Sequence, residues 1–229
     1  KLKVHTTKTA SAVITASYGP VVQSVTVTVA DGRFWYSLGN GLGNGQDNNW
    51  YLDGNSASVV SSDGKKTIVQ MGSGYRGDLW LARSGKGKVV NVTPAGYRYF
   101  AIKVGFKSQL VPGKNKPNGC IKLEIFDDGI KKIGPEYFGT GGDANNRYEI
   151  LGASEISTTE PNVLYYDLQS KYKTVTPTDW NQVFDLAQCK FVIADFPETA
   201  QTYDLYWIRS FKSIEELQAF VDSENNTNE

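Results

Sequence analysis

The chain has very few of the residues that most often carry catalysis and metal binding. Among 229 residues there is one histidine, His5, and there are two cysteines, Cys120 and Cys189. A Ser-His-Asp or Cys-His nucleophile system and a histidine-rich zinc site each need an imidazole inside the domain, so both classes are excluded. Two cysteines are also too few for a disulfide scaffold or a cysteine metal cluster. We interpret them as small buried residues of strands, and a single disulfide between them is the alternative.

The sequence also lacks an excess of either charge and any long apolar run. Lysine and arginine together number 24, as do aspartate and glutamate, and no segment concentrates basic residues. The electrostatic footprint of a protein that binds nucleic acid or an anionic membrane is therefore missing. No run of about 18 apolar residues is present, so we predict no transmembrane segment in the chain.

Aromatic residues and glycine, by contrast, are abundant. The chain has 13 Tyr, 10 Phe, 5 Trp and 23 Gly. Aromatic side chains favour the half-buried surface of a sheet. Residues 25–29 alternate valine and threonine, and residues 97–104 and 203–211 are further strand-length runs bounded by turn residues. Roughly ten or more such strands predict an all-β sandwich.

One segment near the C-terminus has helical character. Ser213 and Glu216 have the spacing of a capping box, and apolar residues follow on one helical face. The pattern predicts a short C-terminal helix. No linker divides the chain, so residues 1–222 are interpreted as a single β-sandwich domain, and residues 1–30 either supply strands to it or form a separate N-terminal element. Residues 223–229 have no apolar anchors and are expected to be a disordered tail.

Several segments resemble a family of domains exported by gut bacteria of the Bacteroides type. They are residues 94–104, 163–168 and 203–211, the last followed by the helical residues 212–217, and the ending Tyr-Trp-Ile-Arg-Ser-Phe is the most specific part. The resemblance covers about residues 67–217. It implies a galactose-binding-like jelly roll, similar in plan to carbohydrate-binding modules of glycan-uptake systems. It also implies that Trp207 and Arg209 are packing residues, and it brings no established function.

Sugar binding is the chemistry that the aromatic and amide residues favour. Flat rings cover the apolar face of a sugar, while amides, carboxylates and guanidinium groups bind its hydroxyls. The candidates are aromatic and polar residues in glycine-rich or amide-rich segments, namely Asn49, Trp50, Tyr51, Tyr75, Arg76 and Trp180. The structural alternatives are that Trp50 closes the core and that Trp180 anchors a helical turn.

No metal or cofactor is required by the sequence. The run Asp143-Ala144-Asn145-Asn146 offers oxygen ligands to calcium but lacks the ligand spacing of an EF-hand loop. A polar loop is the simpler interpretation, and a structural calcium is the alternative.

Together these features predict a monomeric, non-catalytic module that binds a polysaccharide or oligosaccharide. The expected location is extracellular, at a bacterial cell surface, with a leader removed and a lipid anchor outside this sequence. Two alternatives stay open: a glycoside hydrolase or lyase of jelly-roll shape, for which no pair of carboxylates stands out, and a spacer or docking domain that binds no sugar.

Overall fold

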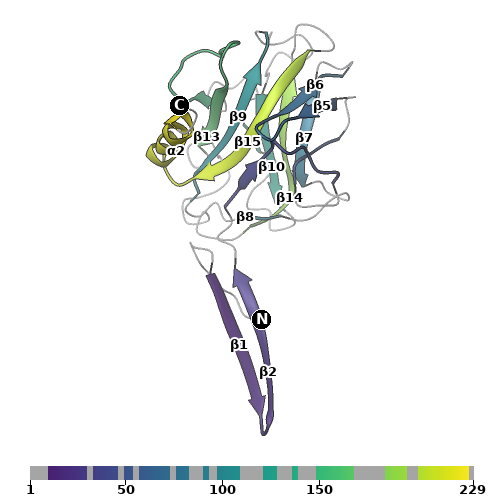
Figure 1. The fold of residues 1–229 in the computed structure, drawn as a ribbon, viewed down its shortest axis with the longest axis vertical. Coiled ribbons are helices and arrows are strands. Elements are labelled where there is room, and N and C mark those ends of the chain that lie inside the picture. Colours follow the sequence, from purple (N-terminus) through teal and green to yellow (C-terminus); the bar gives the residue numbers. More distant parts are fainter. Residues whose placement is uncertain are drawn as a thin grey trace.

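The computed structural model describes residues 10–29, 33–45, 49–53, 57–72, 76–82, 90–92, 97–108, 121–127, 136–138, 148–167, 184–194 and 201–226. Two antiparallel sheets form the body of the molecule, and a helix lies against the outer side of one of them (Figure 1). This arrangement confirms the prediction of an all-β sandwich with a short C-terminal helix.

The described strands fall into three sheets. A separate two-stranded sheet pairs β1 (Ala10–Tyr18) with β2 (Val21–Val29). The six-stranded sheet has the order β11 (Glu136–Phe138), β10 (Ile121–Asp127), β14 (Phe184–Ala194), β7 (Arg76–Ala82), β4 (Tyr51–Leu52), and β8 (Val90–Val92) also pairs with β14. The seven-stranded sheet has the order β12 (Glu149–Ile150), β13 (Asn162–Asp167), β9 (Tyr99–Phe106), β15 (Thr202–Phe211), β6 (Thr67–Gln70), β5 (Ser58–Ser62), and β3 (Trp35–Ser37) also pairs with β15.

Aromatic rings fill the space between the two large sheets. Phe100 of β9 and Phe191 of β14 are buried, and their ring centroids lie 5.6 Å apart across the sandwich. Tyr166 of β13 lies 5.9 Å from Phe191, centroid to centroid. Because side chains alternate along a strand, Phe100 and Ile102 of β9 face this core, while Ala101 faces the opposite side.

Helix α2 (Ile214–Asn226) covers part of the outer face of the seven-stranded sheet (Figure 1). Leu217 is buried there in a second apolar cluster with Ala101 and Phe211. The helix begins at the predicted capping box, in which Ser213 Oγ accepts a hydrogen bond from Glu216 N at 3.2 Å.

The helix ends later than the sequence indicated. Residues 223–226, expected in a disordered tail, form its last turn. The cause is a polar anchor: the carboxylate of Glu224 accepts hydrogen bonds from Trp207 Nε1 at 3.1 Å and from Lys103 Nζ at 3.0 Å. Both donors belong to the sheet. The expectation of a disordered tail rested on the lack of apolar residues there, and it did not take these polar contacts into account.

Strands β1 and β2 project from the body as a hairpin (Figure 1). Gly19 has a φ of +56° and precedes Pro20 in the two-residue turn, which suits a type II′ hairpin connection. The hairpin is a sheet of its own, as one of the two alternatives for residues 1–30 supposed. The division of the chain into domains stays a prediction.

Candidate functional site

Trp50 and Tyr51 lie inside the molecule, which corrects the expectation that they face solvent from a loop. Their exposed fractions are 0% and 6%. The Trp50 ring lies 5.6 Å from Phe191 between centroids, and it meets the ring of Tyr36 edge-on at 6.2 Å. A buried indole cannot stack on a sugar from solution, so the alternative in which Trp50 closes the core is correct.

Among the other predicted site residues, the structure describes the side chain of Asn49 alone. The side chain of Asn49 bonds to the backbone: its Oδ1 accepts a hydrogen bond from Trp50 N at 2.9 Å. Tyr75 and Trp180 lie outside the described residues, as does the Asp143–Asn146 run. Arg76 opens β7, but the position of its side chain is not described. Binding by Tyr75, Arg76 and Trp180 therefore stays a prediction.

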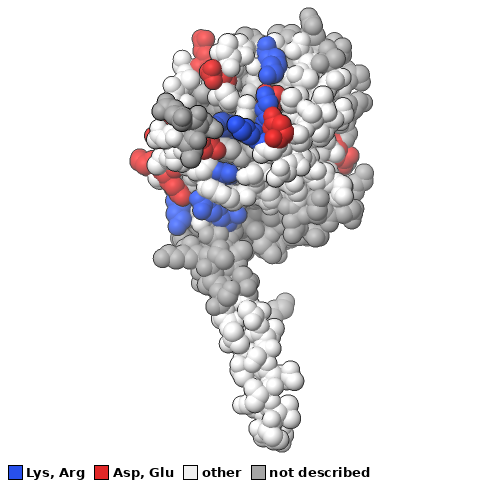
Figure 2. Space-filling model, viewed as in Figure 1, with Lys and Arg blue, Asp and Glu red and all other residues white. Residues whose placement is uncertain are grey.

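A different set of polar and aromatic side chains gathers on the outer face of the seven-stranded sheet. We call it the β15 strip; it consists of Asp204, Tyr206 and Arg209 of β15, Lys103 of β9, Trp35 of β3, and Lys66 and Lys107 from the turns beside them. The strip lies on the face seen in Figure 2, where basic and acidic side chains cross the sheet beside the helix.

A β-bulge in β15 shapes the strip. Leu205 pairs with Val104 of β9, whereas the next residue of β15 that pairs with β9 is Trp207, opposite Lys103. Tyr206 is the extra residue of this bulge. Leu205 belongs to the core, so the bulge turns both Tyr206 and Trp207 toward the outer face. Trp207 is then covered by α2, with 3% of its surface exposed, whereas Tyr206 stays partly exposed.

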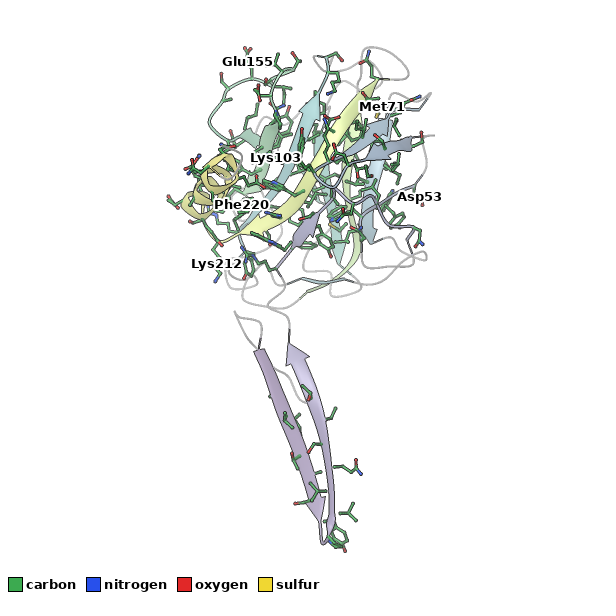
Figure 3. The ribbon with its side chains drawn as sticks, in the orientation of Figure 1. Asp53, Met71, Lys103, Glu155, Lys212 and Phe220 are labelled. Atoms are coloured by element: carbon green, nitrogen blue, oxygen red, sulfur yellow. The ribbon has the colours of Figure 1, made fainter. Side chains whose placement is uncertain are left out.

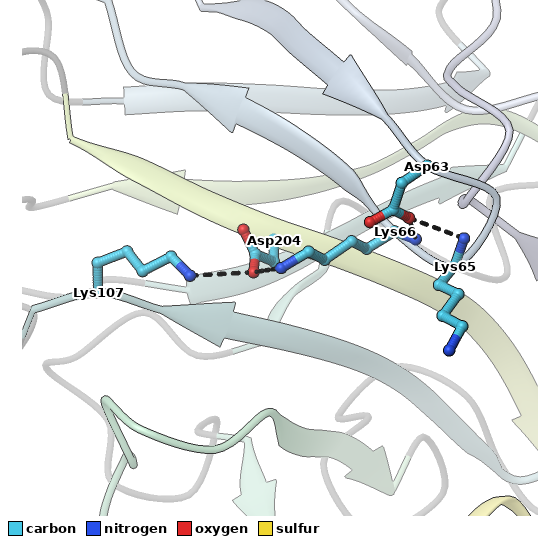
Figure 4. A network of polar contacts seen from close by, with 5 residues as sticks. All are labelled: Asp63, Lys65, Lys66, Lys107 and Asp204. Atoms are coloured by element: carbon cyan, nitrogen blue, oxygen red, sulfur yellow. Dashed lines mark hydrogen bonds and ion pairs between the residues drawn. The ribbon is translucent and has the colours of Figure 1, made fainter. Parts of the chain in front are cut away.

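At one end of the strip a buried carboxylate sits between two lysines. Asp204 Oδ2 lies 2.6 Å from Lys66 Nζ and 3.2 Å from Lys107 Nζ (Figure 4). Asp204 is 2% exposed, and its other oxygen, Oδ1, has no hydrogen-bond partner among the described residues. The hydrogen bond to Asp204 raises the pKa of Lys66, so Lys66 keeps its positive charge beside the buried carboxylate.

The turn between β5 and β6 holds Lys66 in place. Asp63 Oδ1 accepts hydrogen bonds from Lys65 N at 2.9 Å and from Lys66 N at 2.8 Å. These bonds stabilise the carboxylate and lower the pKa of Asp63. Gly64 takes a φ of +88° at the tip, a conformation that favours glycine.

Tyr206 and Lys103 form the middle of the strip. Lys103 Nζ lies 5.5 Å from the Tyr206 ring centroid, within cation–π range. Burial is the main cause that raises the pKa of Tyr206, so its phenol stays protonated at neutral pH. Lys103 is labelled in Figure 3, on β9 beside the helix that carries Phe220.

At the other end an exposed indole lies between guanidinium groups. Trp35 is 41% exposed, and the guanidinium carbons of Arg33 and Arg209 lie 3.7 Å and 4.3 Å from its ring centroid. Arg209 is 8% exposed, donates from Nη2 to Ser37 Oγ at 3.1 Å, and has no hydrogen-bond partner for Nε among the described residues. Burial lowers the pKa of Arg209.

Trp35 was not among the residues predicted to bind sugar, although the sequence held a signal for it. In the run Phe34-Trp35-Tyr36 the strand alternation places Trp35 opposite its two aromatic neighbours, which both pack on the core. The predicted sugar-binding residues were aromatic residues of loops, and Trp35 lies in a strand, so the prediction missed it. Arg209 and Trp207, by contrast, are buried as the family resemblance implied.

A second polar contact joins two strands of the six-stranded sheet. Lys190 Nζ lies 3.2 Å from Asp78 Oδ2 and 4.5 Å from the Trp80 ring centroid. All three residues are buried. Because each charge is paired, we assign this contact to the joining of β7 and β14.

Residues 39–217 match the model of a family described as a domain of unknown function, DUF4979. The chain belongs to this family. The match to the DUF4979 domain runs from the turn after β3 into the first turn of α2, so it includes Asp204, Tyr206 and Arg209. Trp35 and the hairpin lie before it. No curated protein matches the chain.

The expectation of an uncharacterised family is thereby confirmed, while bacterial origin, export and kinship with carbohydrate-binding modules stay predictions. Cys189 is a free, buried thiol, and Cys120 lies outside the described ranges. In the part of the chain that the structure describes, no group of three or more His, Cys, Asp and Glu residues could hold a metal ion. Within the same ranges, no helix has the length and hydropathy needed to cross a bilayer.

Proposed function

We propose that this chain is a non-catalytic glycan-binding module and that the β15 strip holds the sugar chain. The observation that carries the proposal is the Trp35 indole, which is 41% exposed beside the buried guanidinium of Arg209. An indole left in water next to fixed hydrogen-bond donors is the combination that a sugar ring with its hydroxyls requires.

The Arg33 side chain lies over the Trp35 ring and must give way to a stacked sugar. Arg33 is itself exposed, and its ion pair with Glu216 of α2 has an N···O distance of 3.3 Å. An exposed pair of this kind contributes about 0–1 kcal/mol and an exposed cation–π contact about 0.5–1 kcal/mol, so moving Arg33 costs at most about 2 kcal/mol. Once displaced, its guanidinium can donate hydrogen bonds to the hydroxyls of the same sugar.

The rest of the strip supplies polar contacts along a chain. Because of the bulge, Asp204 and Arg209 of β15 pair with Gly105 and Ala101 of β9, which are four residues apart, so the two side chains are spaced by about 13 Å at about 3.3 Å per residue. Lys66 and Lys107, held beside the buried Asp204 carboxylate, can donate hydrogen bonds to hydroxyls of the sugar chain. The strip therefore suits a short stretch of oligosaccharide rather than one sugar.

The expected affinity is modest. One stacked sugar removes about 60–80 Å² of apolar surface from water, worth roughly 1.5–2 kcal/mol at about 25 cal/mol/Å². Two or three contacts, after the cost of association, correspond to dissociation constants of about micromolar to millimolar. Such values suit a module on a surface that engages a polymer at many points.

Two features of the strip favour binding over catalysis. A glycoside hydrolase uses two carboxylates that flank the scissile bond, but Glu224 near the strip already accepts hydrogen bonds from Trp207 and Lys103. A lyase that used a tyrosine base would need a lowered pKa, whereas burial raises the pKa of Tyr206. Both features support a site that recognises sugar without cleaving it.

The test is isothermal titration calorimetry of the purified chain against a panel of neutral and acidic polysaccharides. Trp35→Ala removes one stacking contact, so we expect the dissociation constant to rise about tenfold, which corresponds to about 1.4 kcal/mol. Asp204→Asn, which keeps the shape but weakens the pairing with Lys66 and Lys107, should weaken binding by a similar factor. Tyr18→Ala is the matched control, because Tyr18 is an aromatic residue 90% exposed on the hairpin, far from the strip (Figure 1).

Three outcomes would count against the proposal. Binding that is unchanged in Trp35→Ala would move the site elsewhere, with Tyr75, Arg76 and Trp180 as the next candidates. No binding to any glycan of the panel would favour the spacer function. Release of reducing ends from a polysaccharide by the unmodified chain would favour the hydrolase.

A further inference from the structure

The hairpin of β1 and β2 has one apolar face and one hydroxyl-bearing face. Residues opposite each other in the register share a face, and Thr15 and Ser24, whose hydroxyl oxygens lie 2.8 Å apart, mark the hydroxyl face. That face carries Val13, Thr15, Ser17, Val22, Ser24 and Thr26. The apolar face carries Ala12, Ile14, Ala16, Tyr18, Val21, Gln23, Val25 and Val27. A face with one polar residue in eight is the pattern of a strand pair that packs on a core.

The apolar face is nevertheless open to water. Tyr18 is 90% exposed, Val25 58% and Ile14 42%. Among the described residues, exposed large apolar side chains outside the hairpin number three, at Trp35, Val59 and Val60. An isolated two-stranded hairpin is marginally stable in water. Burial of this apolar face against another surface would stabilise it.

Both edges of the hairpin are also open and uncharged. β1 and β2 pair with each other and with no other described strand. Residues 10–29 contain no charged residue, and the parts of the hairpin that are not grey are white in Figure 2. Natural edge strands are protected by charges, bulges or prolines, and the one proline here, Pro20, lies in the turn. These edges are therefore suited to pair with a further strand.

A second copy of the chain is too small an occupant for this surface. Each strand has nine residues, so the hairpin is about 30 Å long and about 10 Å wide. Stacking two hairpins face to face covers roughly 300 Å² on each, whereas a stable specific interface covers about 800 Å² per partner. A two-layered β-sheet domain can cover the face with one sheet and pair with an edge of the hairpin through the other, which buries more of the hairpin than stacking two hairpins does.

We infer that the hairpin completes a neighbouring β-sheet domain, covering the uncharged inner face of that domain and extending its open edge. The partner surface must be uncharged, because residues 10–29 have no group that could neutralise a lysine or a carboxylate buried against them. The inner strands of the partner are therefore alternating runs of valine, isoleucine, leucine or aromatic residues. The Ser and Thr face of the hairpin stays in water as the outside of the completed sandwich.

The experiment is site-specific photo-crosslinking of the whole protein in the cells that naturally make it, with a benzophenone side chain at position 14 of the apolar face. Mass spectrometry then identifies the attached peptide. The expected peptide is an uncharged strand of alternating β-branched or aromatic residues from another β-domain. Adding Val25→Lys should reduce this adduct at least tenfold, because Val25 lies directly opposite Ile14, and Thr26→Lys on the hydroxyl face should leave it unchanged.

Val25→Lys could also abolish the adduct by unfolding the hairpin. Hydrogen exchange of the hairpin amides is therefore a second measurement, made without this substitution. With the partner domain bound, these amides should exchange at least tenfold more slowly than in the 229-residue chain alone. An adduct with the same hairpin of a second copy, an adduct with lipid, no adduct, or equal exchange in the two samples would each overturn the inference. None of these results depends on glycan binding.

Discussion

Trp35 and Trp50 show that residue type alone does not determine whether a side chain is buried. Trp50 follows a glycine-rich loop and is buried, whereas Trp35 lies in a strand and is exposed. The loop folds inward because the amide of Gly43 donates a hydrogen bond to Trp50 O at 2.6 Å. Gly39 lies so close to the backbone of Gly64 that a Cβ atom would clash with the Gly64 carbonyl. The contacts of Gly43 and Gly39 join residues that are not adjacent in the sequence. The burial of Trp50 therefore could not be predicted from the sequence of the loop.

Replacing each indole with alanine should therefore have opposite effects on stability and binding. Trp50→Ala leaves a cavity among Phe100, Phe191 and Tyr36, and we expect the free energy of unfolding to fall by about 3–5 kcal/mol. Trp35→Ala removes exposed ring contacts and should cost about 1 kcal/mol. Urea unfolding followed by circular dichroism measures both changes. Equal losses for the two variants would contradict the burial difference on which the site assignment rests.

At the scale of elements, the strands were predictable and their irregularities were not. Alternation and turn residues located β9 and β15, and the Ser213–Glu216 spacing located the start of α2. The bulge at Tyr206 has no signature in the sequence, because it depends on the register with β9. The end of α2 depends on Glu224 reaching the sheet. The candidate site lies on these irregular features, so sequence patterns found the fold but missed the strip.

The N-terminal cap of α2 is the element-scale contact that is easiest to test. Ser213 Oγ accepts the Glu216 amide, and Glu216 Oε2 accepts the Lys212 amide at 2.7 Å. Ser213→Ala should lower the free energy of unfolding by about 1 kcal/mol, the usual loss for an N-cap serine. Ser223→Ala, near the other end of the helix, is the control and should cost less than about half of that. Thermal unfolding of the three proteins gives both values, and indistinguishable melting temperatures would contradict the cap.

At the scale of the whole molecule, tyrosine phenols that are buried or partly buried in the sandwich tie its stability to alkaline pH. Burial raises the pKa of Tyr36 to about 12, with a smaller contribution from Cys189, and burial also raises the pKa of Tyr166 and Tyr203. In the unfolded chain a tyrosine ionises near pH 10. The stabilisation is therefore complete below about pH 10 and is lost as the pH rises from there toward the pKa values of the folded state.

Each of these three phenols contributes a slope of about 1.4 kcal/mol per pH unit in this range, so together they remove about 4 kcal/mol per unit. Against a typical total of about 5–15 kcal/mol, we expect cooperative unfolding between about pH 11 and pH 12.5. Tyrosinate absorbance at 295 nm should then rise in step with the loss of circular dichroism. Tyr36→Phe removes one ionising group without opening a large cavity and should move the midpoint to higher pH, whereas Tyr18→Phe, at the exposed end of the hairpin, should not move it. A phenolate signal that develops fully while the sandwich stays folded would mean that these rings are in contact with water.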